Sequence, residues 1–266
     1  MRETHVGNGK DRVMKTLICV LIALMISLAG TTVHAELDTL WYWSADGGDH
    51  QLDRIHASIE LEDGSIVSTG DINVIAENVI GDGFLMKHSA DGIQLWNQIY
   101  ELPGQQILFD LDTTQDNGFV LVGWTVSDGD RGWVVRTDSE GDTLWTRTFS
   151  FGTHRWLNKI LATTDGGFLA VGTADLSAEE YYAWALKLDS DGNEEWSRTY
   201  APDQLGAAGY GGVVETQTGD FIIGGVVSPD YGIGWPYLVK VDAVGDTIWT
   251  RQYQTAGIQS SWVTSV

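Results

Sequence analysis

The fold is decided by a segment in the middle of the chain, Trp184 to Tyr200, which reads WALKLDSDGNEEWSRTY. Similar segments place tryptophans at intervals of 55, 49, 51 and 53 residues, at Trp41, Trp96, Trp145, Trp196 and Trp249. Fixed residue types surround the last four. The basic residues nine positions earlier are Lys87, Arg136, Lys187 and Lys240. The aromatic residues three positions before those are Phe84, Trp133, Trp184 and Tyr237. The glycines four positions before each tryptophan are Gly92, Gly141, Gly192 and Gly245. The aromatic residues four positions after it are Tyr100, Phe149, Tyr200 and Tyr253. This register indicates an internal repeat of about fifty residues.

Each repeat has the pattern of four short strands. The third one contains apolar or alternating runs at 159–163, 168–172, 184–188 and 195–200, and glycine-containing turns separate the first two runs and the last two. No helical periodicity follows the N-terminal segment. Four antiparallel strands per repeat are typical of a β-propeller blade, in which stacking neighbours cover both faces of every sheet. We therefore predict an all-β, propeller-type array, with the five register tryptophans largely buried between blades.

The repeats predict where the blades lie. Complete blades are expected at about 53–100, 107–149, 157–200 and 210–253, within a repeat domain at 36–266. Residues 37–45 resemble a fourth strand without its three partners, and residues 261–266 resemble the first strand of a further blade. The expectation is an incomplete ring, and hence a fragment of a longer protein.

The N-terminus has the layout of a signal peptide. An apolar run of 14 residues, Leu17 to Gly30, follows Lys15 and precedes the small-residue site Val33-His34-Ala35. Such a run is short for a membrane span and typical of secretory signals. We predict a signal peptide at 1–35 with cleavage after Ala35, and an upstream extension at 1–13 if translation starts at Met14. Cys19 lies early in the apolar run, whereas a lipidated cysteine would follow it.

Composition excludes several classes of protein. The single cysteine cannot form a disulfide within the chain, and an apolar content of 43% supports a sizeable core. The formal charge of −22 argues against nucleic acid and anionic lipid as partners. We expect a secreted or cell-surface protein, with no membrane insertion after signal cleavage and with an extracellular protein or glycan as its unknown partner.

The repeats resemble those of secreted bacterial β-propeller repeat proteins. The resemblance rests on Thr164–Gly172 (TDGGFLAVG) and Trp184–Tyr200, and it extends from Trp41 to Val266. It implies a fold and leaves function open. Quinoprotein-type propellers are distantly similar, but their D-x-x-T-G-x-x-x-W turn is one residue longer than the D-x-x-G-x-x-x-W found here at Asp138, Asp189 and Asp242, with Ser89 in the first unit. The sialidase Asp-box has three steps from glycine to tryptophan, where this chain has four.

No catalytic, cofactor-binding or metal site is predicted. Common nucleophile, zinc and phosphate-loop motifs are absent from the sequence. The histidines of the mature chain, expected near turns or loops, are His50, His56, His88 and His154. Three arginines recur two residues after the tryptophans and are expected to pack on rings and pair with acids: Arg147, Arg198 and Arg251. The acidic turns at 189–193 and 128–130 offer too few oxygens for calcium, so we expect their aspartates to cap turns.

Two functions remain open. The uniform blades favour a non-catalytic repeat module that serves as a binding or scaffold domain. The alternative is an enzyme, either one acting on extracellular polysaccharide or a quinoprotein-like oxidoreductase. In that case the variable loops at Thr125–Arg131, Ala174–Tyr181 and Ser228–Gly234 would carry the active site.

Overall fold

The computed structural model describes residues 51–75, 81–127, 129–150, 152, 155–177, 180–200, 206–230 and 233–253. The predicted signal peptide, the two predicted partial blades, Trp41, His50 and His154 lie outside these residues. All regular structure in the described part of the chain is β-strand, so the all-β prediction is confirmed. No helix there is long and apolar enough to cross a membrane.

Sixteen strands form four separate sheets, each an antiparallel meander of four strands in chain order. The first sheet contains β1 (Gln51–Glu60), β2 (Ile66–Ile75), β3 (Asp82–His88) and β4 (Gln94–Tyr100). The second contains β5 (Gln106–Thr113), β6 (Phe119–Thr125), β7 (Arg131–Thr137) and β8 (Thr143–Phe149). The third contains β9 (Arg155–Ala162), β10 (Phe168–Ser177), β11 (Glu180–Leu188) and β12 (Glu194–Tyr200). The fourth contains β13 (Gly206–Glu215), β14 (Phe221–Asp230), β15 (Ile233–Val241) and β16 (Thr247–Gln252).

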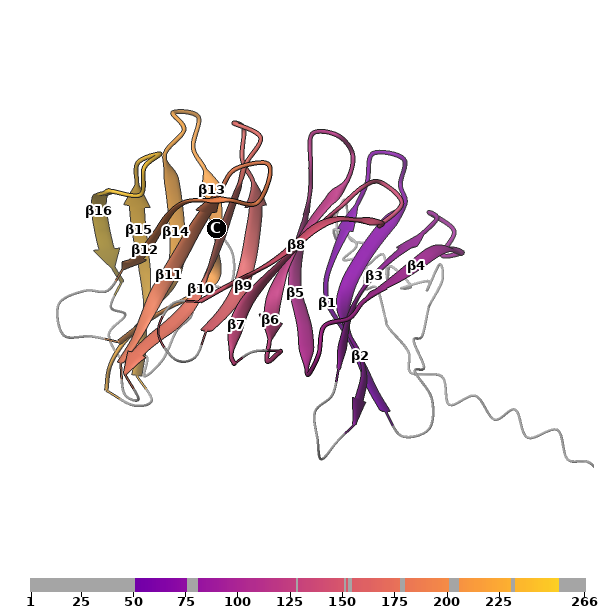
Figure 1. Ribbon diagram of the computed structural model, residues 1–266. Helices are drawn as coiled ribbons and strands as arrows, with labels where there is room; N and C mark the ends of the chain where they lie inside the picture. The colour runs from indigo at the N-terminus through magenta and orange to yellow at the C-terminus, as the bar shows by residue number, and fades with distance from the viewer. Residues whose placement is uncertain are drawn as a thin grey trace, which may run out of the picture.

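The four sheets stand side by side in chain order and form an open, propeller-like array (Figure 1). The first strand of each sheet packs against the first strand of the next, through β1, β5, β9 and β13. The described residues form four such blades and no closed ring. Each blade begins one to four residues before its predicted start, because its first strand continues to pair with the second beyond an irregularity in register.

Glycine makes the tight turn between the third and fourth strands of every blade. The four register glycines have φ between 77° and 85°, in the left-handed region that a Cβ atom disfavours. The matching turn between the first and second strands uses Gly64, Gly166 and Gly219, and in the second blade Asn117 at φ 64°. Asparagine tolerates this conformation better than other residues with a side chain, so the turn is preserved without glycine.

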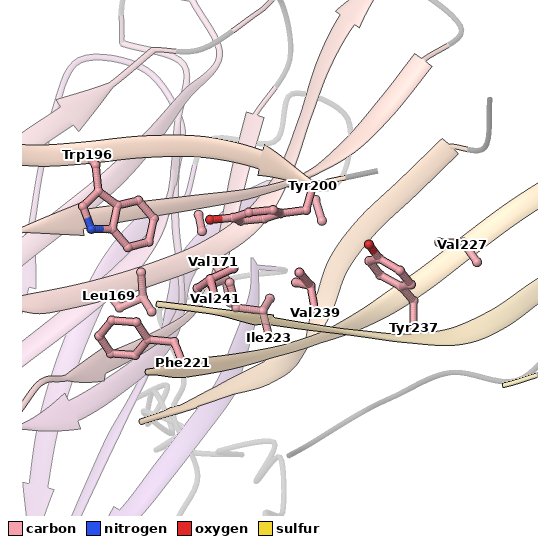
Figure 2. Packing of buried hydrophobic residues seen from close by; sticks show 12 residues of the cluster. Leu169, Val171, Trp196, Tyr200, Phe221, Ile223, Val227, Tyr237, Val239 and Val241 are labelled. Atoms are coloured by element: carbon pink, nitrogen blue, oxygen red, sulfur yellow. The ribbon is translucent and has the colours of Figure 1, made fainter. Parts of the chain in front are cut away.

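The hydrophobic core lies in the seams between blades. One cluster joins the first and second blades, another joins the second and third, and a third joins the third and fourth. Figure 2 shows the last of these, where Leu169 and Val171 of β10 face Phe221 and Ile223 of β14. A four-stranded sheet cannot bury both of its faces alone, so the blades stabilise one another by stacking.

Candidate functional site

The register tryptophans hold the end of one blade against a turn of the next. An ideal Cβ built on Gly192 would lie 2.9 Å from Trp145, and one on Gly245 would lie 2.9 Å from Trp196. The Trp196 indole Nε1 also donates to the carbonyl oxygen of Ala243 at 2.9 Å. Glycine is therefore required in the turn both for its φ and for the ring that packs on it.

Among the four register tryptophans that the structure describes, the prediction of burial holds for Trp196, which is 7% exposed, and for no other. Trp96, Trp145 and Trp249 are partly exposed. All three lie on the last strand of their blades, and a turn of the next blade packs on Trp96 at Gly141 and on Trp145 at Gly192.

The recurring basic residue forms an ion pair with the turn between the first two strands of its own blade. Lys187, only 2% exposed, lies 2.9 Å from Asp165 and 3.0 Å from Glu195. The equivalent pairs are Lys87–Asp63, Arg136–Asp116 and Lys240–Asp220. Burial opposes ionisation of Asp165, but hydrogen bonds from Thr163 and Lys187 lower its pKa to about 2. The recurrence of this pair in all four described blades indicates that it stabilises the blade.

The aspartate that opens each D-x-x-G turn caps the turn, as predicted. Asp189 Oδ1 accepts the backbone amides of Asp191 and Asn193 at 3.0 and 2.8 Å. Asp138 and Asp242 accept the corresponding amides of their own turns. In the part of the chain that the structure describes, no group of three histidine, cysteine or acidic residues could hold a metal ion.

Two of the three recurring arginines, Arg147 and Arg251, pack on rings as predicted. Among the described residues none of the three forms an ion pair with an acid, so that part of the prediction is wrong. The guanidinium carbon of Arg147 lies 5.6 Å from the centroid of Trp145, and Arg251 lies the same distance from Trp249. Their Nη1 atoms donate to the backbone carbonyl of the preceding residue. The two-residue period of a strand places arginine and tryptophan on one face, so the nearest ring belongs to the same strand.

The variable loops of the enzyme hypothesis are mostly strand. Ala174–Ser177 belongs to β10 and pairs with β11, and Ser228–Asp230 belongs to β14. The β10–β11 hairpin remains paired out to Ser177 and Glu180, which leaves little chain for a loop. The loop prediction is therefore wrong for 174–177, 180–181, 228–230 and 233–234, whereas 126–127 and 129–130 do lie between strands. Residues 128, 178–179 and 231–232 lie outside the described part of the chain.

A cleft of about 460 Å³ lies between the second and third blades. Its lining includes Gln115, Asp116, Arg136, Trp145, Phe168 and Asp191. The Trp145 and Phe168 rings meet edge to face at 5.9 Å, and Arg136 lies over Phe168 while paired with Asp116. The aromatic pair recurs between the first two blades as Trp96 and Phe119. Three residues of the cleft lining, Trp145, Phe168 and Arg136, therefore also join the second and third blades.

Two aspartates of β5, Asp110 (buried) and Asp112 (partly buried), join the first strands of neighbouring blades. Asp110 of β5 accepts from Lys159 Nζ and from the amide of Ile160, both at 3.0 Å, and burial raises its pKa. Asp112 accepts from the amide of Ala162 at 2.8 Å. These bonds give a partner to backbone amides on the free edge of β9, which is an edge strand of its sheet, so they protect that edge.

The residues that do not repeat gather at a β-bulge in the first strand. The register skips one residue in each of three blades, at His56 in β1, Phe109 in β5 and Asn158 in β9. Two residues before each bulge residue, a backbone carbonyl oxygen of the first strand approaches the second strand so closely that only glycine fits opposite it. These oxygens belong to Arg54, Ile107 and Trp156. A Cβ on Gly70, Gly123 or Gly172 would lie 1.8 to 1.9 Å from them.

Directly after these glycines come three unlike residues, Asp71, Trp124 and Thr173. Asp71 Oδ1 lies 2.5 Å from His56 Nε2. His56 lies in the middle of β1, so the prediction that it lies near a turn or loop is wrong. The His56 ring contacts Phe109 of the next blade edge to face at 5.4 Å. We define the bulge site as the three bulge residues and the three residues after the glycines. The sequence analysis did not predict this site. Its signal in the sequence is that the repeated glycine of the second strand is followed by a different kind of residue in each blade.

No family model and no curated protein matches the chain. Among solved structures, the chain is similar to a crystal structure of a protein of unknown function from Dyadobacter fermentans, with a TM-score of 0.55 and 14% sequence identity. The alignment covers 78% of this chain and 70% of that one. At this identity the likeness shows the fold alone, which agrees with the repeated four-stranded sheets.

Proposed function

We propose that this protein is a secreted or cell-surface β-propeller repeat module that binds a partner without transforming it. The observation that supports the proposal is that the repeated polar residues form contacts within the blades. The buried lysine and arginine side chains pair with turns of their own blades, and the D-x-x-G aspartates cap turns. The repeated charged side chains therefore stabilise the blades and their turns.

The sequence supports export. The apolar run at Leu17–Gly30 and the small-residue site at Ala35 form a signal peptide whose removal leaves a chain without cysteine. Cysteine-free chains are compatible with an oxidising extracellular environment, since they cannot form wrong disulfides. The strong negative charge supports a neutral or cationic partner, either an extracellular protein or a glycan.

The experiment compares binding with turnover. The mature chain is incubated with neutral polysaccharides and with proteins from the surface of the producing cell. Retained partners are identified, and the same mixtures are analysed by mass spectrometry for cleaved or oxidised products. Binding with unchanged partners is the expected result. Accumulation of a product at a constant rate per molecule of protein would overturn the proposal.

One observation favours the enzyme alternative. Asp71 orients the His56 ring through Nε2, and a histidine held by a carboxylate is a common general base. If the protein acts on polysaccharide, His56→Ala should abolish product formation even at polysaccharide concentrations that saturate binding. If no product forms with the unmodified chain, His56 has a structural or binding role.

A further inference from the structure

The bulge site differs from the rest of the molecule in how its positions vary between blades. The seam positions keep the same residue type from blade to blade, and so do the glycines that precede the second half of the site. At the bulge site itself, His56–Asp71, Phe109–Trp124 and Asn158–Thr173 have no chemistry in common. In repeat proteins the shared positions build the scaffold, and positions that vary on one side of it are available to recognise a ligand.

The bulge site also holds buried polar atoms that lack partners. Among the described residues, hydrogen-bond partners are missing for Asp71 Oδ2, Trp124 Nε1, Asn158 Oδ1 and Thr173 Oγ1. Asp71 and Thr173 are 0% exposed. Native proteins pair nearly all such atoms, and an unpaired cluster points to a bound water, ion or ligand. Here the atoms belong to equivalent positions in three consecutive blades, which places them along one side of the array.

The site extends across the blades, because the residues after the three glycines face three successive seams. The first strands of consecutive blades pack against each other, and the ring contact between His56 and Phe109 connects the first blade to the second at this level. Phe109, Trp124 and Asn158 are only partly buried, so the site reaches the surface while its polar atoms lie beneath.

We infer that the bulge site binds a neutral glycan chain that runs across the blades, an inference that rests on the proposed binding function. Asp71 Oδ2 and Asn158 Oδ1 require donors, Trp124 Nε1 requires an acceptor, and the Thr173 hydroxyl accepts either role. Sugar hydroxyl groups donate and accept, so successive units of one glycan chain can pair with the polar atoms of successive seams. The rings of Phe109 and Trp124 supply apolar surface for the C–H faces of a pyranose. A buried carboxylate at Asp71 and the negative charge of the chain disfavour anionic sugars.

The test measures binding of a panel of neutral oligosaccharides to the full mature chain by calorimetry. Two variants each remove one polar atom: Thr173→Val keeps the shape of the side chain, whereas Trp124→Phe also removes part of the ring. A control, Asp191→Asn, alters the cleft between the second and third blades. We expect each bulge variant to weaken sugar binding about tenfold, the loss of one hydrogen bond, and the control to bind as the unmodified chain does.

A second readout separates binding from folding. Because the Thr173 hydroxyl has no partner in the free protein, Thr173→Val should melt no lower than the unmodified chain without sugar, and should gain less thermal stability when sugar is added. Sugar binding that the control abolishes and the bulge variants do not would overturn the site while leaving the binding function intact.

Capture of a surface protein with no sugar bound would overturn the sugar class. A crystal structure with the sugar panel soaked in, showing only water at the four polar atoms, would also overturn it. If the chain retains no partner of any kind, the proposed binding function fails as well.

Discussion

Truncating Trp196 should destabilise the array far more than truncating Trp249, although both residues occupy the same repeat position. Trp196 is 7% exposed and donates to Ala243 of the next blade, whereas Trp249 is partly exposed. A buried aromatic ring removes about 150–250 Å² from water, which at about 25 cal/mol per Å² corresponds to about 4–6 kcal/mol. Residual burial in the unfolded chain reduces this, so we expect Trp196→Ala to cost about 3–5 kcal/mol.

The control Trp249→Ala should cost about 1–2 kcal/mol, in proportion to its smaller burial. Urea unfolding followed by circular dichroism gives the global loss for both variants. Stacked repeats can unfold in parts, so hydrogen exchange of β12 and β16 is measured as well. Equal losses for the two variants, or a loss below about 1 kcal/mol for Trp196→Ala, would refute the reasoning that the seams hold the blades together.

Three further predictions concern the glycines, the ion pairs and export. Gly172→Ala should prevent a stable fold because its Cβ would lie 1.8 Å from a backbone oxygen, whereas Gly166→Ala, with nothing within 4 Å but φ at 87°, should cost only about 1 kcal/mol; thermal melting compares the two. Asp165 has a pKa of about 2 in the folded state and 3.8 in the unfolded state, so its contribution is complete above 3.8 and is lost as pH falls toward 2. Acid titration of Asp165→Asn should therefore show a shallower loss of stability in that window, and an unchanged slope would contradict the assignment. N-terminal sequencing of the exported protein should begin at Glu36, and a longer chain would refute cleavage after Ala35.

The repeat made most of the fold predictable. The spacing of tryptophan, glycine and basic residues marks the fourth strand and its turn in every unit, and these positions are held by contacts that recur in each blade. Contacts that repeat select the same residue type each time, so they are visible in a single sequence. The number of strands, their order and the turn glycines follow from this periodicity.

The bulge site could not be found in the same way. A bulge adds one residue to a strand without a residue type of its own, and His56, Phe109 and Asn158 share neither size nor polarity. Its indirect trace is the repeated glycine of the second strand, which sequence analysis attributed to an apolar strand. Only the approach of a carbonyl oxygen, visible in the structure, explains why that residue must be glycine.

The predicted loops at 174–177, 180–181, 228–230 and 233–234 were wrong for a related reason. Their residues vary between repeats, and variation suggested irregular chain. In the structure they extend paired strands, because backbone hydrogen bonds continue regardless of side chain.

The central claim is that repeated positions hold the blades together while the varying positions of the bulge site recognise the ligand. The direct test is a substitution scan of the mature chain displayed on a cell surface, with amount displayed and glycan binding read in the same cells. Substitutions at Trp196, Gly245 and Lys187 should reduce display and binding in equal measure. Substitutions at Trp124 and Thr173 should reduce binding at undiminished display. Loss of display at both sets of positions, or binding that survives every substitution at the bulge site, would contradict the account.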